Sequence, residues 1–219
     1  MKPVIISVFL LSFFLSIDAS PIRCYKCHAK NSETCAPTIQ QCMKGERCGI
    51  MSEQYIYNKT FCSVWKGCVA NVPCNETPYS FVNKDVSTKV NIQCCDTDLC
   101  NIKMYEMPKE EEMLGPKCPS CFNPNSTEEC VPDGETTCRA IDDKCMTFAG
   151  TVEKPDGNIE TYSAKGCMSS IGCSLILDQI VGCHIMEEKI FRCDDISPKP
   201  SNRKEEEKNT ISLVPGSYV

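Results

Sequence analysis

Histidine and tryptophan are scarce in this chain of 219 residues, and their scarcity limits its chemistry. The two histidines are His28 and His184, and the one tryptophan is Trp65. A nucleophile–base pair or a zinc site needs several convergent side chains, and the residues near either histidine supply none. We therefore expect no catalytic residue, no metal ligand and no cofactor, and we expect both histidines to be structural or solvent-exposed.

A second long apolar run is missing. The first run, Val4 to Ile17, follows Lys2 and precedes small residues, which is typical of a secretory signal peptide. It is shorter than the roughly 20 residues of a transmembrane helix. We assign residues 1–19 to a signal peptide and expect a secreted, extracellular protein. Residues 211–219 lack the apolar tail of about 10 residues that a lipid-anchor signal needs, so no membrane anchor is expected.

Positive charge is also in deficit, with 23 Lys and Arg against 29 Asp and Glu. Nucleic-acid binding needs a basic surface, so we expect no nucleic-acid partner. Residues 118–195 are the acidic part, with 6 basic and 14 acidic side chains. An acidic surface there would steer a basic protein partner, whereas the alternative is a solvated face that only aids solubility. The candidates are Glu128, Glu129, Asp133, Glu135, Asp142 and Asp143.

Cysteine, by contrast, is abundant. The chain has 20 cysteines, about nine per cent, which is the range of disulfide scaffolds. Small domains of this kind depend on crosslinks because their hydrophobic cores are too small to hold them alone. Disulfides need an oxidising compartment, which agrees with the signal peptide.

The cysteines fall into two groups that repeat one pattern. Both groups open with Cys-x2-Cys, and both contain Lys-Gly-Cys-x5-Cys, which ends at Cys74 in the first group and at Cys173 in the second. The motif Cys118-Pro-Ser-Cys121 superficially resembles a redox site, but it opens a cysteine-dense module in parallel with Cys24 and Cys27. The chain is therefore expected to contain two copies of one module.

Composition sets the expected boundaries of these modules. The first module is assigned to residues 20–107, and a charged linker with prolines to residues 108–117. The second module is assigned to residues 118–195. Residues 196–219 combine low hydrophobicity with dense charge, which predicts a disordered C-terminal tail.

Each module is predicted to consist mostly of β-strands. Residues 54–61 are rich in strand formers around a polar Asn-Lys turn, and residues 88–94 alternate polar and apolar side chains. Residues 146–152 and 159–164 flank a strong turn signal and predict a hairpin. Residues 185–193 fit a last strand, although their pattern is also compatible with a helix.

The stretch from Cys94 to Asn101 has the sequence Cys-Cys-x4-Cys-Asn. Neighbouring residues in a strand point to opposite sides, so Cys94 and Cys95 should reach different partners. Cys95 can close a short loop with Cys100, which leaves Cys94 to fix the last strand to earlier ones. The stretch therefore predicts the end of a small disulfide-built domain.

Taken together, these motifs resemble the Ly6/urokinase-receptor family of three-finger domains. The resemblance covers about residues 22 to 195 and is carried by Cys24-x2-Cys27, Cys48-Gly49, Lys-Gly-Cys68-x5-Cys74 and, above all, Cys94 to Asn101. It implies an all-β, small disulfide-rich fold with two tandem three-finger (Ly6/uPAR-like) domains, in which β-hairpin loops project from a disulfide-bonded hub. The disulfides it implies are Cys24–Cys48, Cys27–Cys35, Cys42–Cys68, Cys74–Cys94, Cys95–Cys100, Cys118–Cys145, Cys121–Cys130, Cys138–Cys167 and Cys173–Cys193.

Two features depart from the family pattern. The second module ends after Cys193 without a Cys-Cys-x4-Cys-Asn motif, and Cys62 and Cys183 have no family partner. These two cysteines could pair with each other across the modules or with another chain in a homo-oligomer, and free thiols are the third alternative.

The combination of two secreted modules with an incomplete second one resembles the gamma-type phospholipase A2 inhibitors. That resemblance implies a protein partner, a secreted phospholipase A2, and inhibition by occlusion of the enzyme surface. The alternative is a secreted signalling protein acting on a receptor, because the sodefrin precursor-like courtship proteins have a similar architecture. No enzymatic activity is expected in either case.

Three Asn-x-Ser/Thr sequons, at Asn58, Asn75 and Asn125, are candidate glycosylation sites. Asn58 lies near the expected tip of the second finger of the first module, a tip that three-finger proteins often use for binding. Residues 171–181 are the most hydrophobic stretch after the signal peptide, and they either form an exposed patch or pack within or between the modules. Trp65 could likewise serve an interface or a core.

Overall fold

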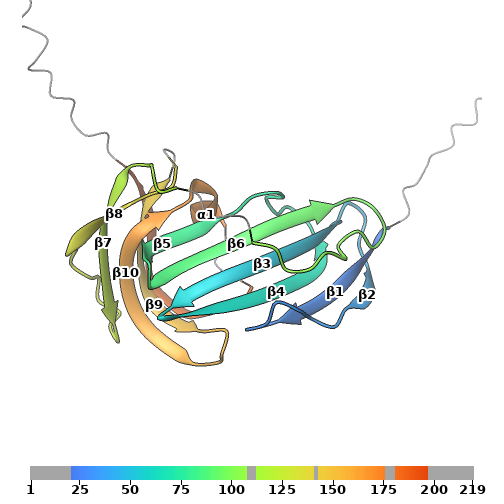
Figure 1. Ribbon diagram of the computed structural model, residues 1–219, viewed down its shortest axis with the longest axis horizontal. Helices are drawn as coiled ribbons and strands as arrows, with labels where there is room; N and C mark the ends of the chain where they lie inside the picture. The colour runs from blue at the N-terminus through green and yellow to red at the C-terminus, as the bar shows by residue number, and fades with distance from the viewer. Residues whose placement is uncertain (1–20, 108–111, 141–142, 176–180, 197–219) are drawn as a thin grey trace, which may run out of the picture.

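The computed structural model describes residues 21–107, 112–140, 143–175 and 181–196, which form one extended sheet that curls strongly at one end (Figure 1). The expected signal peptide and most of the expected tail lie outside these residues. The sheet order is β11-β9-β10-β5-β6-β3-β4-β1-β2, and β7 pairs with β10 and with β8. The bounds are β1 (Arg23–Ala29), β2 (Thr38–Gln41), β3 (Arg47–Tyr57), β4 (Lys59–Val69), β5 (Tyr79–Asn83), β6 (Val86–Cys95), β7 (Lys117–Pro124), β8 (Gly134–Thr137), β9 (Lys144–Glu153), β10 (Ile159–Met168), α1 (Ser170–Ser174) and β11 (His184–Asp195).

The long hairpin of the first module consists of β3 and β4, which are in register from Arg47 opposite Val69 to Tyr57 opposite Lys59. Asn58 alone makes the turn, with a φ of 58°. Asparagine tolerates this left-handed conformation better than most residues, which explains why the polar pair Asn58-Lys59 marked the turn in the sequence. Strand β6 pairs with the other edge of β3 along its whole length.

Two clusters of disulfides form the hubs from which the hairpins project. Because Cys24, Cys48, Cys118, Cys138 and Cys167 have no exposed surface, these bridges occupy the places that large apolar side chains fill in bigger domains. The described cysteines form nine disulfides, which are Cys24–Cys48, Cys27–Cys35, Cys42–Cys68, Cys74–Cys94, Cys95–Cys100, Cys118–Cys145, Cys121–Cys130, Cys138–Cys167 and Cys173–Cys193.

The second module repeats the central hairpin with β9 and β10, which are in register from Ile159 opposite Glu153 to Met168 opposite Lys144. The turn includes Gly157 at a φ of 82°. Residues 185–193, whose pattern fitted both a strand and a helix, belong to β11, which pairs with β9. Tertiary pairing decides this ambiguity because a strand there covers the open edge of β9.

A short pairing between β10 and β5 joins the two modules into one sheet. Cys167 lies opposite Phe81, and Met168 lies opposite Ser80. A Cβ atom at Gly166 would overlap the backbone of Phe81 and Val82, so this joint requires glycine. The Lys-Gly-Cys motif of the second module therefore serves the contact between modules.

The largest hydrophobic cluster is shared by both modules. Tyr55, Tyr57 and Phe61 from the β3–β4 hairpin pack with Phe148, Val152 and others from the second module. In Figure 1 this hairpin points into the curve formed by β9 and β10. The structure is thus an all-β pair of tandem three-finger domains in which the second domain wraps the central finger of the first.

Candidate protein-binding surface

Asn101 fixes the end of the first module to its earliest strands. Its side chain has no exposed surface. The Nδ2 atom donates to the Tyr25 carbonyl at 2.9 Å and to the Gly49 carbonyl at 3.1 Å, and Oδ1 accepts from the Tyr25 amide at 2.9 Å. Because β1 and β3 are both held, the chain leaves the hub at a defined point.

Residues 102–107, which we call the crossing segment, then run across three neighbouring strands. The Lys66 ammonium on β4 donates to the carbonyls of Ile102, at 3.1 Å, and Lys103. The Tyr105 hydroxyl donates to the Glu53 carbonyl on β3 at 3.2 Å. Asn91 on β6 donates to the Glu106 carbonyl at 2.9 Å. Partial burial lowers the pKa of Lys66, yet its hydrogen bonds to the two carbonyls keep it part of this anchor.

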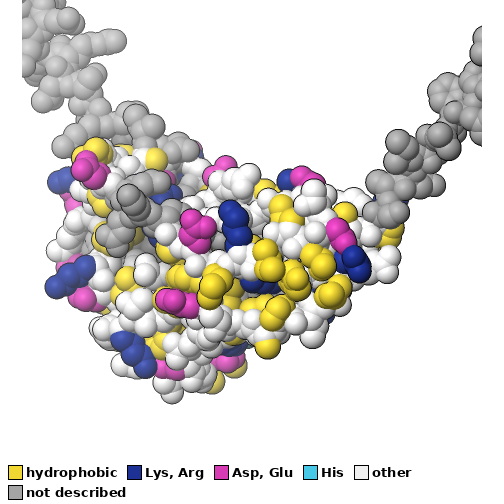
Figure 2. Space-filling model, turned by 45° about the vertical axis from the view of Figure 1, so that its right-hand side comes forward, with side chains coloured by type: hydrophobic (Ala, Val, Ile, Leu, Met, Phe, Trp, Pro, Cys, Tyr) yellow, Lys and Arg dark blue, Asp and Glu magenta, His cyan; other side chains and the backbone are white. Residues whose placement is uncertain are grey.

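The crossing segment presents large apolar side chains to solvent. Ile102 is 66% exposed and Met104 is 70% exposed, while the backbone on either side is held by the anchors above. Figure 2 shows hydrophobic side chains gathered on one face of the molecule. Exposed apolar side chains on an already ordered backbone favour binding, because little further ordering is needed on association. Sequence reasoning missed these two residues, although both are apolar residues directly after a hub motif.

The tip of the β3–β4 hairpin contacts the second module. The Lys59 ammonium lies 3.0 Å from the Asp156 carboxylate, and the Lys154 ammonium lies 4.9 Å from the centre of the Tyr57 ring. Both contacts cross from the first module to the second. The second module therefore contacts the tip at Tyr57 and Lys59, while Asn58 itself is exposed.

The three sequon asparagines share one local conformation. Asn58, Asn75 and Asn125 are all exposed, and their φ angles are 58°, 62° and 59°. Each therefore lies at a turn that leaves its side-chain amide accessible. Their glycosylation stays a prediction.

The acidic candidates of the second module do not form one acidic surface. Asp143 is only 3% exposed and accepts hydrogen bonds from the Tyr79 hydroxyl at 2.5 Å and the Ala140 amide at 2.6 Å. Glu129 lies 2.6 Å from both Lys165 and Arg192, and these two partners lower its pKa to about 2.

The remaining acidic candidates differ in their surroundings. Glu135 lies 3.8 Å from Lys117, Glu128 and Asp133 are exposed, and Asp142 lies outside the described residues. The steering surface was one of two alternatives, and two of its candidates do not fit it: Asp143 serves the contact between modules, and the charge of Glu129 is balanced.

The hydrophobic stretch at residues 171–181 packs between the modules at its described ends. Val181 is 5% exposed and belongs to a cluster with Met51 and Ile92, against which Leu175 and Trp65 also pack. The His28 ring nitrogen Nε2 lies 2.6 Å from the Val181 carbonyl oxygen. Trp65 and His28 thus support the joint between modules, whereas His184 is exposed.

Cys62 and Cys183 are both free thiols. Glu53 and Ser63 face each other across β3 and β4, and the Glu53 carboxylate reaches Gly182, next to Cys183. Cys62, the neighbour of Ser63, points to the opposite side of the hairpin because side chains alternate along a strand. The sheet therefore separates the two thiols. Burial raises the pKa of the Cys183 thiol.

Two groups of cysteine sulfurs lie close enough together to suggest metal ligands. The first group is Cys24, Cys42 and Cys68, and the second is Cys118, Cys138 and Cys167. Within each group the sulfur atoms lie within 4.8 Å of one another. All six sulfurs belong to disulfides, so they are not available as thiolates. Within the described residues, no helix has the length and apolar character needed to cross a bilayer.

Comparison with known proteins agrees with this architecture. The model of the u-PAR/Ly-6 domain matches residues 20–103 and again 115–195. A phospholipase A2 inhibitor 31 kDa subunit from Naja kaouthia is 27% identical over 151 residues, covering 67% of this chain and 78% of the relative. Phospholipase A2 inhibitor PIP from Malayopython reticulatus is 28% identical over 177 residues, covering 78% and 83%.

A third relative is not named a phospholipase A2 inhibitor. Lymphocyte antigen 6 complex locus protein G6d from Rattus norvegicus is 35% identical over 88 residues, covering 36% of this chain and 65% of the relative. The two domain matches together cover most of the chain. The chain therefore belongs to the u-PAR/Ly-6 domain family, with two copies of the domain in tandem.

Proposed function

We propose that this protein is a secreted, non-enzymatic binding protein that inhibits secreted phospholipase A2. Relatives that share both domains are named phospholipase A2 inhibitors, and this supports the proposal at the level of the family. Inhibition follows from occlusion, in which a rigid surface of the inhibitor covers the lipid-facing entrance of the enzyme.

The exposed apolar side chains of the crossing segment carry this proposal. Ile102 and Met104 project from a backbone that is fixed by hydrogen bonds to three strands. An enzyme that works on lipid surfaces presents apolar side chains around its entrance, and burial of the exposed two thirds of Ile102 and Met104 against them would contribute up to about 1–2 kcal/mol each. The net negative charge of the chain, −6, favours encounter with basic enzymes.

The test uses the full-length secreted protein and a panel of basic and acidic secreted phospholipases A2. Binding is measured by surface plasmon resonance, and hydrolysis of phospholipid vesicles is measured in parallel. We expect binding at micromolar concentration or below, with loss of vesicle hydrolysis in the same concentration range. Absence of both binding and inhibition across the panel at micromolar concentration contradicts the proposed function.

A pair of double variants tests the surface. Ile102→Asp with Met104→Asp should weaken binding at least about tenfold, because two apolar contacts become buried charges. Val131→Asp with Ile159→Asp is the matched control, since these side chains are also exposed, at 83% and 59%, but belong to the second module. If the control variant loses binding and the first variant keeps it, the crossing segment is not the binding surface.

A further inference from the structure

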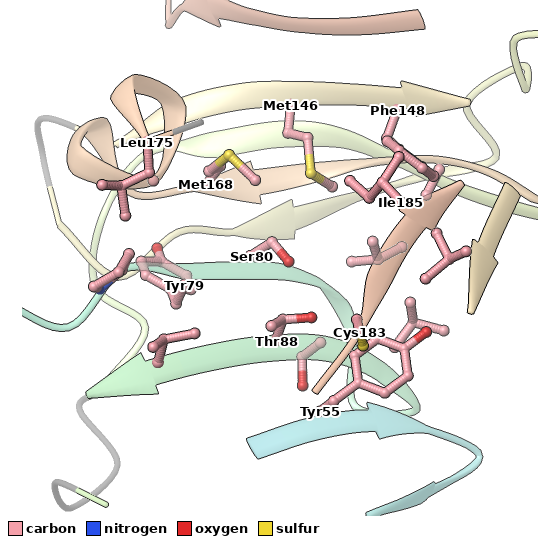
Figure 3. Close-up of a pocket in the computed structure, with 18 of the residues that line it drawn as sticks. Tyr55, Tyr79, Ser80, Thr88, Met146, Phe148, Met168, Leu175, Cys183 and Ile185 are labelled. Atoms are coloured by element: carbon pink, nitrogen blue, oxygen red, sulfur yellow. The ribbon is translucent and has the colours of Figure 1, made fainter. Parts of the chain in front are cut away.

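Two of the hollows in the described part of the chain differ in character. The first lies between the modules (Figure 3), where Met146, Phe148 and Met168 extend from one wall. Its volume is about 120 Å³, less than the roughly 150 Å³ of an apolar cavity that holds benzene, so it reflects packing at the joint between modules. The second has a volume of about 230 Å³ and lies on the first module, beside the crossing segment.

The apolar part of the second hollow comes from the hub of the first module. Ile50 on β3 is only 5% exposed, and Cys94, Cys95 and Cys100 belong to two disulfides. All four line the hollow, and none of them has a charge or a hydrogen-bond donor in its side chain. Burial and the disulfides also fix their positions. They therefore form a rigid apolar wall that favours contact with C–H groups.

The polar part of the lining comes from three other side chains. Gln93 on β6 is half-buried, whereas Asn75 and Lys103 are exposed. Among the described residues that line the hollow, Lys103 alone is charged. Amide and ammonium groups beside an apolar wall suit a neutral molecule with both C–H faces and hydroxyl groups, which is the character of a sugar ring. Sites for drug-sized molecules begin at about 300 Å³, so this smaller hollow suits about one ring.

Asn75 gives the hollow a specific candidate occupant. It is the acceptor asparagine of the sequon Asn-Glu-Thr, and it is part of the lining. Its backbone amide donates to the Ile92 carbonyl at 2.8 Å, and the preceding residue, Cys74, is bridged to Cys94. The attachment point is therefore rigid. A sugar attached there has a high effective concentration beside the hollow, so weak contacts are enough to hold it.

We propose that this hollow holds the first N-acetylglucosamine of a glycan attached to Asn75. The apolar face of the sugar packs on Ile50 and the neighbouring disulfides, and its hydroxyl and acetamide groups form hydrogen bonds with Gln93 and Lys103. Because Lys103 belongs to the crossing segment, the docked sugar gives that segment a further anchor.

The test uses the full-length protein, secreted by cells that make only high-mannose glycans. Three variants each keep one of the three sequon asparagines, Asn58, Asn75 or Asn125, and have glutamine at the other two positions. Lectin chromatography separates glycosylated from unglycosylated chains of each variant, which is practical even if Pro78, directly after the Asn75 sequon, lowers the glycosylated fraction. Endoglycosidase H then leaves a single N-acetylglucosamine, which is too small to shield the surface by bulk.

Two measurements follow the sugar on the variant that keeps Asn75. NMR should show nuclear Overhauser effects between its N-acetyl methyl group and the Ile50 side chain. Trypsin should cut after Lys103 at least about threefold more slowly in the glycosylated form, because cleavage of a folded chain follows local opening. Cleavage after Lys84, in the turn between β5 and β6, should proceed equally in both forms and serves as the internal control.

The variants that keep Asn58 or Asn125 are the matched controls, since neither asparagine is among the described residues that line the hollow. Their glycosylated and unglycosylated forms should be cut after Lys103 at the same rate. Gln93→Trp, added to the variant that keeps Asn75, fills the hollow and leaves the sequon intact, and it should abolish the difference in rate. Circular dichroism and thermal unfolding confirm that each variant is folded.

Absence of any glycan on Asn75 of the secreted protein would overturn the proposal. So would a glycosylated Asn75 whose sugar shows no contact with Ile50, or equal cleavage after Lys103 with and without that sugar. A difference in rate that persists in folded Gln93→Trp would place the sugar outside the hollow. No phospholipase enters these measurements, so their outcome is independent of the proposed function.

Discussion

The carboxylate of Glu53 on β3 accepts a hydrogen bond from the backbone amide of Gly182, just before β11. Glu53 has no exposed surface, and its Oε1 atom has no hydrogen-bond partner within the described chain. A buried, half-satisfied carboxyl therefore lies at the joint between the two modules. Burial raises its pKa to about 7, although the amides of Gly182 and Cys183 and the charge of Lys30 oppose this rise.

The first prediction concerns pH. The folded protein retains the Glu53 proton up to about pH 7, whereas the unfolded chain releases it near the ordinary value of 4.5. Between these values the folded state binds more protons, so the free energy of unfolding falls as pH rises, by up to about 3 kcal/mol. Below pH 4.5 the contribution of Glu53 is fully present, and it is lost as pH passes through 7.

Urea denaturation of the unchanged protein and of Glu53→Gln between pH 4.5 and 8 measures this effect. The glutamine variant should lack the part of the decline that Glu53 causes. Glu33→Gln serves as the control, since Glu33 is exposed, and it should keep the full decline. Parallel pH profiles for the unchanged protein and Glu53→Gln would contradict the prediction.

The second prediction concerns the joint between β10 and β5. Gly166→Ala places a methyl group against the backbone of Phe81 and Val82, and backbone cannot move aside as a side chain can. We expect a loss of about 1–3 kcal/mol in the free energy of unfolding and a larger radius of gyration in X-ray scattering. Gly134→Ala is the control, because a Cβ atom there meets nothing within 4 Å. If Gly166→Ala has the stability of the unchanged protein, β10 and β5 do not approach each other as closely at Gly166 as in this structure.

The third prediction concerns the hub of the first module. Asn101→Ala removes three hydrogen bonds and leaves the Tyr25 and Gly49 backbone groups buried without this partner. The free energy of unfolding should fall by about 2–4 kcal/mol, measured as a lower denaturation midpoint. Asn123→Ala, at an exposed position of β7, should change it by less than about 0.5 kcal/mol. Equal midpoints for the two variants would rule out a structural role for Asn101.

The fourth prediction concerns the two unpaired cysteines. Under native conditions iodoacetamide should modify half-buried Cys62 at least about tenfold faster than Cys183, because Cys183 is buried and its thiol pKa is raised. After unfolding, both should react alike. Mass spectrometry of alkylated peptides follows each site separately. A disulfide-linked peptide that contains Cys62 and Cys183 would contradict the separation of the two thiols by the sheet.

Much of the fold could be predicted from local patterns in the sequence. The turn at Asn58 follows from a residue that tolerates positive φ between two runs of strand formers. The repeat of Lys-Gly-Cys-x5-Cys indicated two copies of one module, and the family model matches the chain twice. These features depend on residues close together in the chain, so the sequence is enough to indicate them.

The candidate surface could be predicted only in part. The sequence indicated a protein-binding function through resemblance, but the only candidate positions it offered were the hairpin tip, the hydrophobic stretch at residues 171–181, Trp65 and the acidic side chains. The sequence around Asp143 does not indicate that this side chain is buried, because its hydrogen-bond partner Tyr79 lies 64 positions earlier in the chain. Ile102 and Met104 were missed, because an apolar residue after a hub motif is as compatible with a buried position as with an exposed one.

By itself, the sequence determined the repeat of the cysteine pattern and the central hairpins, since these depend on spacing and on alternation along a strand, whereas the cysteine pairing came from the family resemblance. The tertiary structure decided which face of each strand meets the other module. That choice places Cys62 and Cys183 on opposite sides of the sheet, buries Glu53 and Tyr55 at the joint, and leaves Ile102 and Met104 exposed. Alternation gives two faces to every strand, and only packing against a distant element shows which of them is buried.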